Sequence, residues 1–199
     1  MVNHSDRLGW KAKKESAYFY SEIAKSYQEL YIEEQSAKYD IALKTLQTPL
    51  LGIVLDVGCG QGEFLQRISG NVILGVGIDI SLGMLGEAKN VTESVIDFIC
   101  ADADYLPFRE RVFDSAFSFT LLQNMPDPSF TLCEMLRVTQ TNALVVVSFP
   151  LYAKPFEETD IWFKGTNRLW ARIDSNTQTK EHIFFCGRTS TEDTKNQPK

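Results

Sequence analysis

The sequence predicts an α/β fold in which a mostly parallel sheet carries helices on both faces. The first observation is an alternation: after Pro49, short apolar runs alternate with segments of helical periodicity. Strands that alternate with helices at this rhythm run parallel, because each right-handed crossover returns the chain to the end of the sheet where the previous strand began. The second observation is a pair of strand-like runs joined by a turn-rich segment near the C-terminus. It predicts an antiparallel C-terminal hairpin at the sheet edge.

The composition limits the functions that the chain can have. Its 199 residues suffice for one domain with a sizeable core, and the net charge of -6 argues against an electrostatic binder of DNA or of anionic membranes. Four scattered cysteines and two histidines do not form the usual zinc pattern, so we expect no metal. No apolar run is long enough to insert into a membrane, and the first residues do not resemble a signal peptide. We therefore expect a cytoplasmic protein with reduced thiols.

Residues 1–48 are predicted to form a separate helical segment that precedes the core. Aromatic and aliphatic residues recur at spacings of three and four over residues 15–46, which is typical of helix, and a break is expected near residues 33–36. Residues 1–14 are polar and mixed, so we expect them to be frayed. The basic run KAKK within them is interpreted as the solvated start of a helix.

Residues 49–190 are predicted to form the core, and residues 191–199 a disordered tail. Ser81 is a plausible N-cap, and Pro128 or Ser129 begins the helix after the fourth strand. The predicted strands are 52–58, 71–80, 94–103, 113–121 and 142–150, followed by the hairpin strands 168–174 and 181–188. The predicted helices are 63–70, 81–90 and 129–139.

The stretch LDVGCGQGEF predicts a strand that turns sharply into a helix against a ligand. Gly58, Gly60 and Gly62 are spaced more tightly than the dinucleotide fingerprint G-x-G-x-x-G. Asp56 and Glu63 flank this loop and would repel the pyrophosphate that such a fingerprint binds. S-adenosylmethionine has a carboxylate for the backbone N–H groups and two cations for the acids. The charge pattern therefore favours S-adenosylmethionine over NAD.

The same stretch, extended to VLDVGCGQGEF, resembles motif I of the class I S-adenosylmethionine-dependent methyltransferases, and GVGIDIS resembles the motif that follows it. The resemblance covers roughly residues 18–150. It implies a Rossmann-like methyltransferase fold with a mostly parallel seven-stranded sheet, S-adenosylmethionine as cofactor and S-adenosylhomocysteine as product. In that family an acid at the end of the second strand holds both ribose hydroxyls, and Asp79 occupies this position. The alternative is that Asp79 merely caps the next helix.

Two further stretches extend the resemblance. ADADYLPF is similar to the family's D-A-x-x-L-P-F segment, which implies that Asp102 contacts the adenine amino group and that Ala103 lies near the ring. Asp104 is the competing acid. Thr120 and Gln123 follow the fourth strand and are expected near the sulfonium.

The N-terminal run YFYSEIAKSYQELY resembles the helical lid of ubiquinone- and menaquinone-type methyltransferases. The resemblance implies that Tyr27 closes over the cofactor, where its ring would face the sulfonium in a cation–π contact. Tyr18 or Tyr20 is the second choice, and the alternative is that these tyrosines are ordinary core-facing residues. The complete predicted cofactor site is Tyr27, Asp56, Gly58, Cys59, Gly60, Gly62, Asp79, Ile80, Met84, Asp102, Ala103, Thr120 and Gln123.

The leading functional hypothesis is a methyltransferase that acts on a small molecule. No histidine lies near the motifs, and His182 on the hairpin is not sufficient to name a catalytic base. Motifs for methylating base amines or cytosine C5 are missing after the fourth strand, which argues against a DNA substrate. The alternatives are a protein or RNA methyltransferase, a methyltransferase-like protein that binds the cofactor and acts through a partner, and an NAD-linked oxidoreductase. The segment 151–166 is shorter than the family's usual helix, which leaves the shape of the acceptor pocket open.

Overall fold

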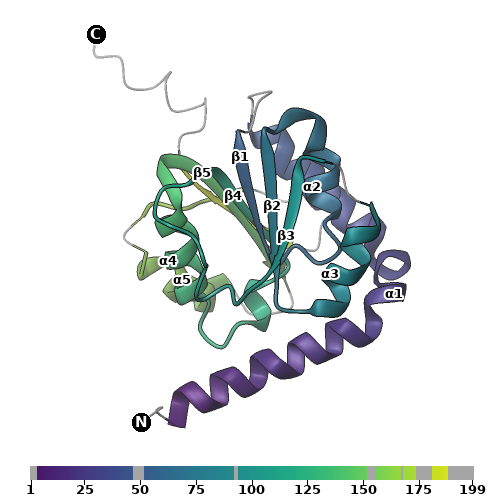
Figure 1. Cartoon of the computed structure of the whole chain (residues 1–199). Helices are drawn as coiled ribbons and strands as arrows, with labels where there is room; N and C mark the ends of the chain where they lie inside the picture. Colours follow the sequence, from purple (N-terminus) through teal and green to yellow (C-terminus); the bar gives the residue numbers. More distant parts are fainter. Residues whose placement is uncertain are drawn as a thin grey trace.

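The computed structural model describes residues 4–46, 52–91, 94–151, 156–166, 168–173 and 181–187. Within these ranges the chain forms a seven-stranded sheet with the order β3-β2-β1-β4-β5-β7-β6 (Figure 1). The strands are β1 (Ile53–Val57), β2 (Leu74–Asp79), β3 (Ile96–Cys100), β4 (Phe113–Phe119), β5 (Thr139–Pro150), β6 (Ala171–Ile173) and β7 (Glu181–Cys186). Strands β1 to β5 pair in parallel, and β7 runs antiparallel to both β5 and β6. The predicted fold class is therefore confirmed.

Helices cover both faces of the sheet. The helices α2 (Glu63–Ile68) and α3 (Leu82–Ala88) and the second half of α1 (His4–Leu46) lie on one side, and α4 (Pro128–Val138) and α5 (Phe156–Lys164) lie on the other (Figure 1). Ser81 caps α3 by accepting the N–H of Met84, and α4 begins at Pro128 after the N-cap Asp127, as expected from the sequence. The segment after β5 does form a helix, α5, although it has only nine residues.

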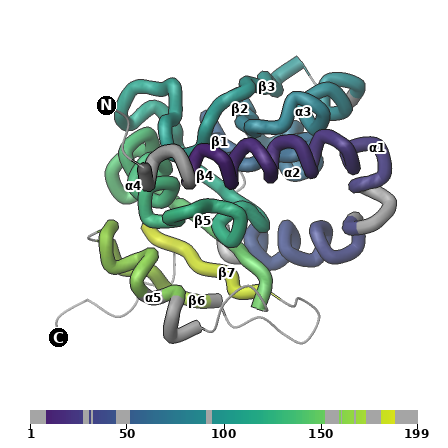
Figure 2. The backbone as a smooth tube through the Cα atoms, turned by 90° about the horizontal axis from the view of Figure 1, so that it is seen from below, coloured from purple at the N-terminus to yellow at the C-terminus, as the bar shows by residue number. Residues whose placement is uncertain are grey.

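The N-terminal helix differs from the sequence-based prediction in two ways. It begins at His4 rather than after residue 14, and it is assigned as one helix through the predicted break at residues 33–36. Figure 2 shows that its two halves nevertheless run in different directions. The first half crosses the ends of the central strands, and the second half packs on the sheet, where Tyr39 and Ala42 are buried against Val54. The expectation of a frayed N-terminus was wrong for residues 4–14 because Lys13 is buried in a long-range contact.

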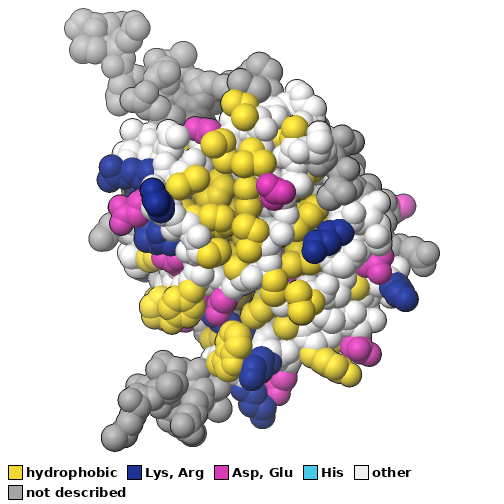
Figure 3. All heavy atoms as spheres, viewed as in Figure 1, with side chains coloured by type: hydrophobic (Ala, Val, Ile, Leu, Met, Phe, Trp, Pro, Cys, Tyr) yellow, Lys and Arg dark blue, Asp and Glu magenta, His cyan; other side chains and the backbone are white. Residues whose placement is uncertain are grey.

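The opposite face carries less helical cover beside β3. Residues 101–112, which connect β3 to β4, form turns rather than a crossover helix. Ile53, Leu74 and Ile99 on this side of the sheet are only partly buried. Figure 3 shows hydrophobic side chains gathered in the middle of the face seen in Figure 1.

The predicted tail at residues 191–199 and the predicted hairpin turn at residues 175–180 lie outside the described residues. No helix in the described part of the chain is long and apolar enough to cross a membrane.

Candidate functional site

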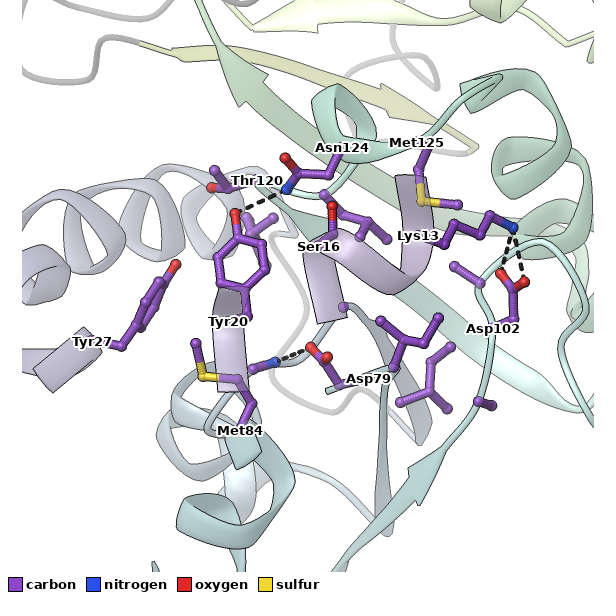
Figure 4. Close-up of a pocket in the computed structure, with 18 residues that line it drawn as sticks. Lys13, Ser16, Tyr20, Tyr27, Asp79, Met84, Asp102, Thr120, Asn124 and Met125 are labelled. Carbon is purple, nitrogen blue, oxygen red and sulfur yellow. Dashed lines mark hydrogen bonds and ion pairs between the residues drawn. The ribbon is translucent and has the colours of Figure 1, made fainter. Parts of the chain in front are cut away.

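A pocket lies where the parallel strands β1 to β4 end, and the first half of α1 covers it (Figure 4). Such a position is where ligands bind in open α/β sheets, because the crossovers diverge there. Residues from the loops after four strands and from α1 line the pocket. They are Lys13, Ser16, Tyr20, Tyr27, Gly58, Gly60, Ile78, Asp79, Ile80, Met84, Ala101, Asp102, Ala103, Phe119, Thr120, Leu121, Asn124 and Met125.

The glycine loop is held against the end of β2. Gly58 and Gly60 have φ angles of 75° and 54°, in the left-handed region that a side chain disfavours. The N–H groups of Gly58 and Cys59 both donate to the carbonyl of Ile78, at 2.8 and 2.9 Å. This arrangement brings the backbone of the loop to the pocket wall, where no side chain stands between it and a ligand.

Asp79 binds two backbone N–H groups. Its Oδ2 accepts from Gly60 N at 2.9 Å, and its Oδ1 accepts from Ser81 N at 2.8 Å. Asp79 therefore caps the turn before α3 and also lines the pocket, while its binding of the ribose hydroxyls stays a prediction. Burial raises the pKa of its carboxyl, although these hydrogen bonds oppose the rise.

Asp56 lies behind the glycine loop rather than on the main pocket wall. It lines a smaller adjoining pocket with Tyr39 and Glu63, and it is 2% exposed. Burial, with a smaller contribution from the charge of Asp79, raises the pKa of Asp56 to about 8. The two acids consequently form a centre that a cation would stabilise.

Asp102 has a partner that the sequence did not predict. The Lys13 ammonium donates to both Asp102 oxygens, at 2.7 and 2.8 Å, and to Asp104 Oδ2 at 2.5 Å. Asp104 also accepts from Thr131. The acid expected to bind an amino group therefore binds an ammonium in this structure, and Lys13 lies over the ring of Tyr105. The interpretation of KAKK as solvated was wrong for Lys13, because its ammonium meets this pair of acids.

The aromatic residues of the lid divide into two groups. Tyr20 and Tyr27 line the pocket and their rings meet at 6.1 Å between centroids, whereas Tyr18 is 69% exposed. Asn124 Nδ2 donates to the Tyr20 hydroxyl at 3.0 Å, and Gln35 Nε2 donates to that of Tyr27 at 3.2 Å. Burial raises the pKa of Tyr27. In Figure 4 Tyr20 stands between Asp79 and Thr120 and is thus more central than Tyr27.

A buried ionic cluster supports the far wall of the pocket, where β4 ends. Lys38 on α1 donates to Thr120 Oγ1 at 2.6 Å and to Glu181 Oε1 on β7 at 3.0 Å. The side chains of Lys38 and Glu181 are both 0% exposed. Burial raises the pKa of Glu181, while the charge of Lys38 opposes the rise.

Nine of the thirteen predicted site residues line the main pocket: Tyr27, Gly58, Gly60, Asp79, Ile80, Met84, Asp102, Ala103 and Thr120. The other four are Asp56, Cys59, Gly62 and Gln123. Asp56 and Cys59 line the adjoining pocket. Gly62 has a φ of 75° at the start of α2, and a Cβ there would lie 2.4 Å from the Phe98 ring. Gln123 points its amide to the carbonyl of Thr120.

The remaining sequence candidates lie away from the pocket. His182 does not line it and is buried against the rings of Phe149 and Phe184. In the described part of the chain no group of three or more His, Cys, Asp or Glu side chains is arranged to hold a metal. Lys13 and Asn124 line the pocket but were missed, because no sequence motif distinguishes them from surface residues.

Comparison with known proteins gives one matching family, described as "Methyltransferase domain", over residues 55–147. The chain is 39% identical over 95 residues to a demethylmenaquinone methyltransferase of Renibacterium salmoninarum, covering 48% of this chain and 40% of that protein. It is 31% identical over 173 residues to a malonyl-[acyl-carrier protein] O-methyltransferase of Buchnera aphidicola, covering 86% of this chain and 65% of that protein. The chain thus spans about half the length of the curated relatives it matches.

A solved structure agrees with the fold. The chain superposes with a TM-score of 0.71 and 16% identity on a structure described as a complex between the Haloferax volcanii Trm112 methyltransferase activator and a methyltransferase. The match covers 84% of this chain and 96% of that chain. At this identity the likeness concerns the fold alone.

Proposed function

The chain belongs to the class I S-adenosylmethionine-dependent methyltransferases, and from this premise we propose that it transfers a methyl group from S-adenosylmethionine to a small-molecule acceptor. The observation that carries the proposal is the convergence of Gly60, Asp79 and Asp102 on one pocket, from the ends of three adjacent parallel strands. When bound, the cofactor would supply an activated methyl group on a sulfonium, which is a good leaving group. The protein's contribution is then chiefly to bind and orient the two reactants.

The residues of the pocket fit this cofactor. Asp79 offers carboxylate oxygens to the ribose hydroxyls, and Asp102 offers them to the adenine amino group. Gly58 and Gly60 leave the backbone accessible to the methionine carboxylate. Asp56 is buried behind the same loop and has a raised pKa, and a cation beside it would stabilise its charged form.

The first half of α1 would act as the lid over this cofactor. Tyr20 and Tyr27 reach the pocket from this helix, and their rings can exclude water and face a sulfonium. In this proposal residues 1–48 serve the pocket, residues 49–190 form the core that binds the cofactor, and the free cysteines support a cytoplasmic location.

A small-molecule acceptor is supported by the names of the curated relatives. Demethylmenaquinone is a small molecule, and a malonyl group is small although a carrier protein bears it. A second candidate is a cofactor-binding protein that works through a partner, which is favoured by the fold's likeness to a methyltransferase solved with an activator. Methylation of protein or RNA is a third candidate.

Titration calorimetry with S-adenosylmethionine and S-adenosylhomocysteine tests the cofactor. We expect both to bind, and Asp79→Ala to weaken binding by roughly 10- to 100-fold, the usual effect of losing hydrogen bonds to a charged group. Asp97→Ala is the matched control, because Asp97 on β3 is exposed and does not line the pocket. If neither compound bound the unmodified protein, the proposal would be wrong.

Transfer of a radiolabelled methyl group to cell fractions tests the acceptor class. We expect label in the metabolite fraction and none in protein or RNA. Label in a macromolecular fraction would support the third candidate. Tight cofactor binding without transfer, relieved by a partner, would support the second.

A further inference from the structure

The backbone of Thr120 is strained at the point where β4 enters the pocket. Its φ is 59°, and a positive φ is a genuine outlier for a β-branched residue. Hydrogen bonds hold it on both sides: its N–H donates to the carbonyl of Ser148 at 3.0 Å, and its carbonyl accepts from Gln123 at 2.7 Å. Strain of this kind persists only where neighbours enforce it, and it gathers at functional sites. Thr120 is one of the residues that line the pocket, and its hydroxyl contacts Lys38.

The hydrogen bonding of this hydroxyl fixes its role. A threonine hydroxyl has one proton to donate and two lone pairs that accept. Lys38 can only donate, so Thr120 Oγ1 is the acceptor in their 2.6 Å contact. Within the described residues Lys38 is the only partner of this hydroxyl. Its proton is therefore available to a ligand in the pocket.

The cation behind Thr120 is itself held rigidly. Lys38 is fully buried and contacts buried Glu181 at 3.0 Å and the more exposed Glu34 at 3.6 Å. A buried pair of this kind seldom adds net stability, because desolvation costs about as much as the attraction returns. The ion pair does fix the position of the Lys38 ammonium, which stays within hydrogen-bond distance of the Thr120 hydroxyl. A hydroxyl that accepts from a cation becomes a stronger donor to the next group.

Resting on the proposed function, we propose that Thr120 binds the methyl acceptor by donating its hydroxyl proton to an anionic oxygen, and that Lys38 and Glu181 are positioning residues that hold Thr120 in this role. The acceptor is accordingly a small organic molecule with a carboxylate. An acceptor that is already ionised needs no general base.

Ligand-observed NMR on the protein loaded with S-adenosylhomocysteine tests the inference with matched probes: benzoate with benzamide, phenylacetate with phenylacetamide, and hexanoate with hexanamide. We expect each carboxylate to bind more tightly than its amide. Thr120→Val removes the hydroxyl but keeps the branched shape, and it should weaken carboxylate binding by about tenfold, as expected for a hydrogen bond to a charged group. Thr120→Ser keeps the hydroxyl and should restore most of the binding.

Carboxylate binding by combined variants tests whether Lys38 and Glu181 act by positioning Thr120. Lys38→Met combined with Glu181→Leu removes both charges together, which avoids leaving one of them buried alone. This double variant should weaken carboxylate binding, and adding Thr120→Val to it should cause little further loss, because all three residues act through one hydroxyl. Independent, additive losses would show that the pair does not act through Thr120.

Three results would overturn the inference: amides that bind as well as carboxylates, equal carboxylate binding by Thr120→Val and the unmodified protein, or no carboxylate binding to the loaded protein at millimolar concentration. Because Thr120 also belongs to the predicted cofactor site, the affinity of Thr120→Val for S-adenosylhomocysteine is measured in parallel, and carboxylate binding is compared only at saturating S-adenosylhomocysteine. A failure of the unmodified protein to bind S-adenosylhomocysteine would instead refute the proposed function.

Discussion

The acids at the centre of the sheet differ from those near its sides in whether a lysine neutralises them. At the sides, α1 supplies a lysine to each group: Lys13 to Asp102 and Asp104, and Lys38 to Glu181. At the centre, Asp56 and Asp79 have no ion-pair partner among the described residues, and both have raised pKa values. The comparison shows that the protein places no cation of its described residues beside the two central acids. The chain pairs its outer acids with its own lysines, whereas Asp56 and Asp79 have no such partner among the described residues.

The largest expected effect comes from breaking the fully buried outer pair. Lys38→Met should lower the free energy of unfolding by about 3–5 kcal/mol, because Glu181 would be left buried without its cation. Urea denaturation measures this change. The double variant Lys38→Met with Glu181→Leu should recover most of the loss, and an equal loss in both variants would contradict the ion-pair explanation.

At the centre of the sheet, removing an acid should raise the free energy of unfolding rather than lower it. The folded-state pKa of Asp56, about 8, lies above the ordinary value of 3.8, so the folded protein binds this proton more tightly than the unfolded chain does. The resulting stability is present below about pH 4 and is lost as the pH rises towards 8. Asp56→Asn cannot ionise, so at pH 9 it should be more stable than the unmodified protein, by at least about 1 kcal/mol.

Melting temperatures at pH 5 and pH 9 measure this difference. At pH 5 the difference should be smaller than at pH 9, because the loss begins near pH 4, where the unfolded chain ionises, and continues up to the folded-state pKa of about 8. A destabilisation by Asp56→Asn that grew with pH would mean that the acid is ionised and partnered in the folded state.

The smallest effect is expected at the other lysine. The side chain of Lys13 is 9% exposed and those of its partners are 16% and 10% exposed, so water can reach the acids when Lys13 is removed. Lys13→Met should therefore cost about 1 kcal/mol, between the values typical of surface and buried pairs. Lys11→Met is the control, since Lys11 is 73% exposed and should change stability hardly at all. A loss as large as that of Lys38→Met would remove the distinction between the two lysines.

The sequence predicted the residues at the centre of the sheet better than the lysines that pair with the outer acids. The alternation of strands and helices, the glycine loop and Asp79 follow from local patterns: apolar runs, glycine spacing and an acid at the end of a strand. The lysines could not be predicted in this way. Lys13 meets Asp102 across 89 positions, and Lys38 meets Glu181 across 143. A lysine in a helix usually lies in solvent, and only the tertiary fold selects the two that do not.

The path of α1 has a consequence for how the two ends of the pocket respond to each other. One helix carries both Lys13, which holds the acid predicted to bind adenine, and Lys38, which supports Thr120. A ligand that displaces Lys13 from Asp102 acts on the same helix that fixes the opposite wall. By thermodynamic linkage, the factor by which the first ligand changes the affinity for the second must equal the factor in the reverse direction. Any coupling that α1 carried between the two ligands would therefore be reciprocal.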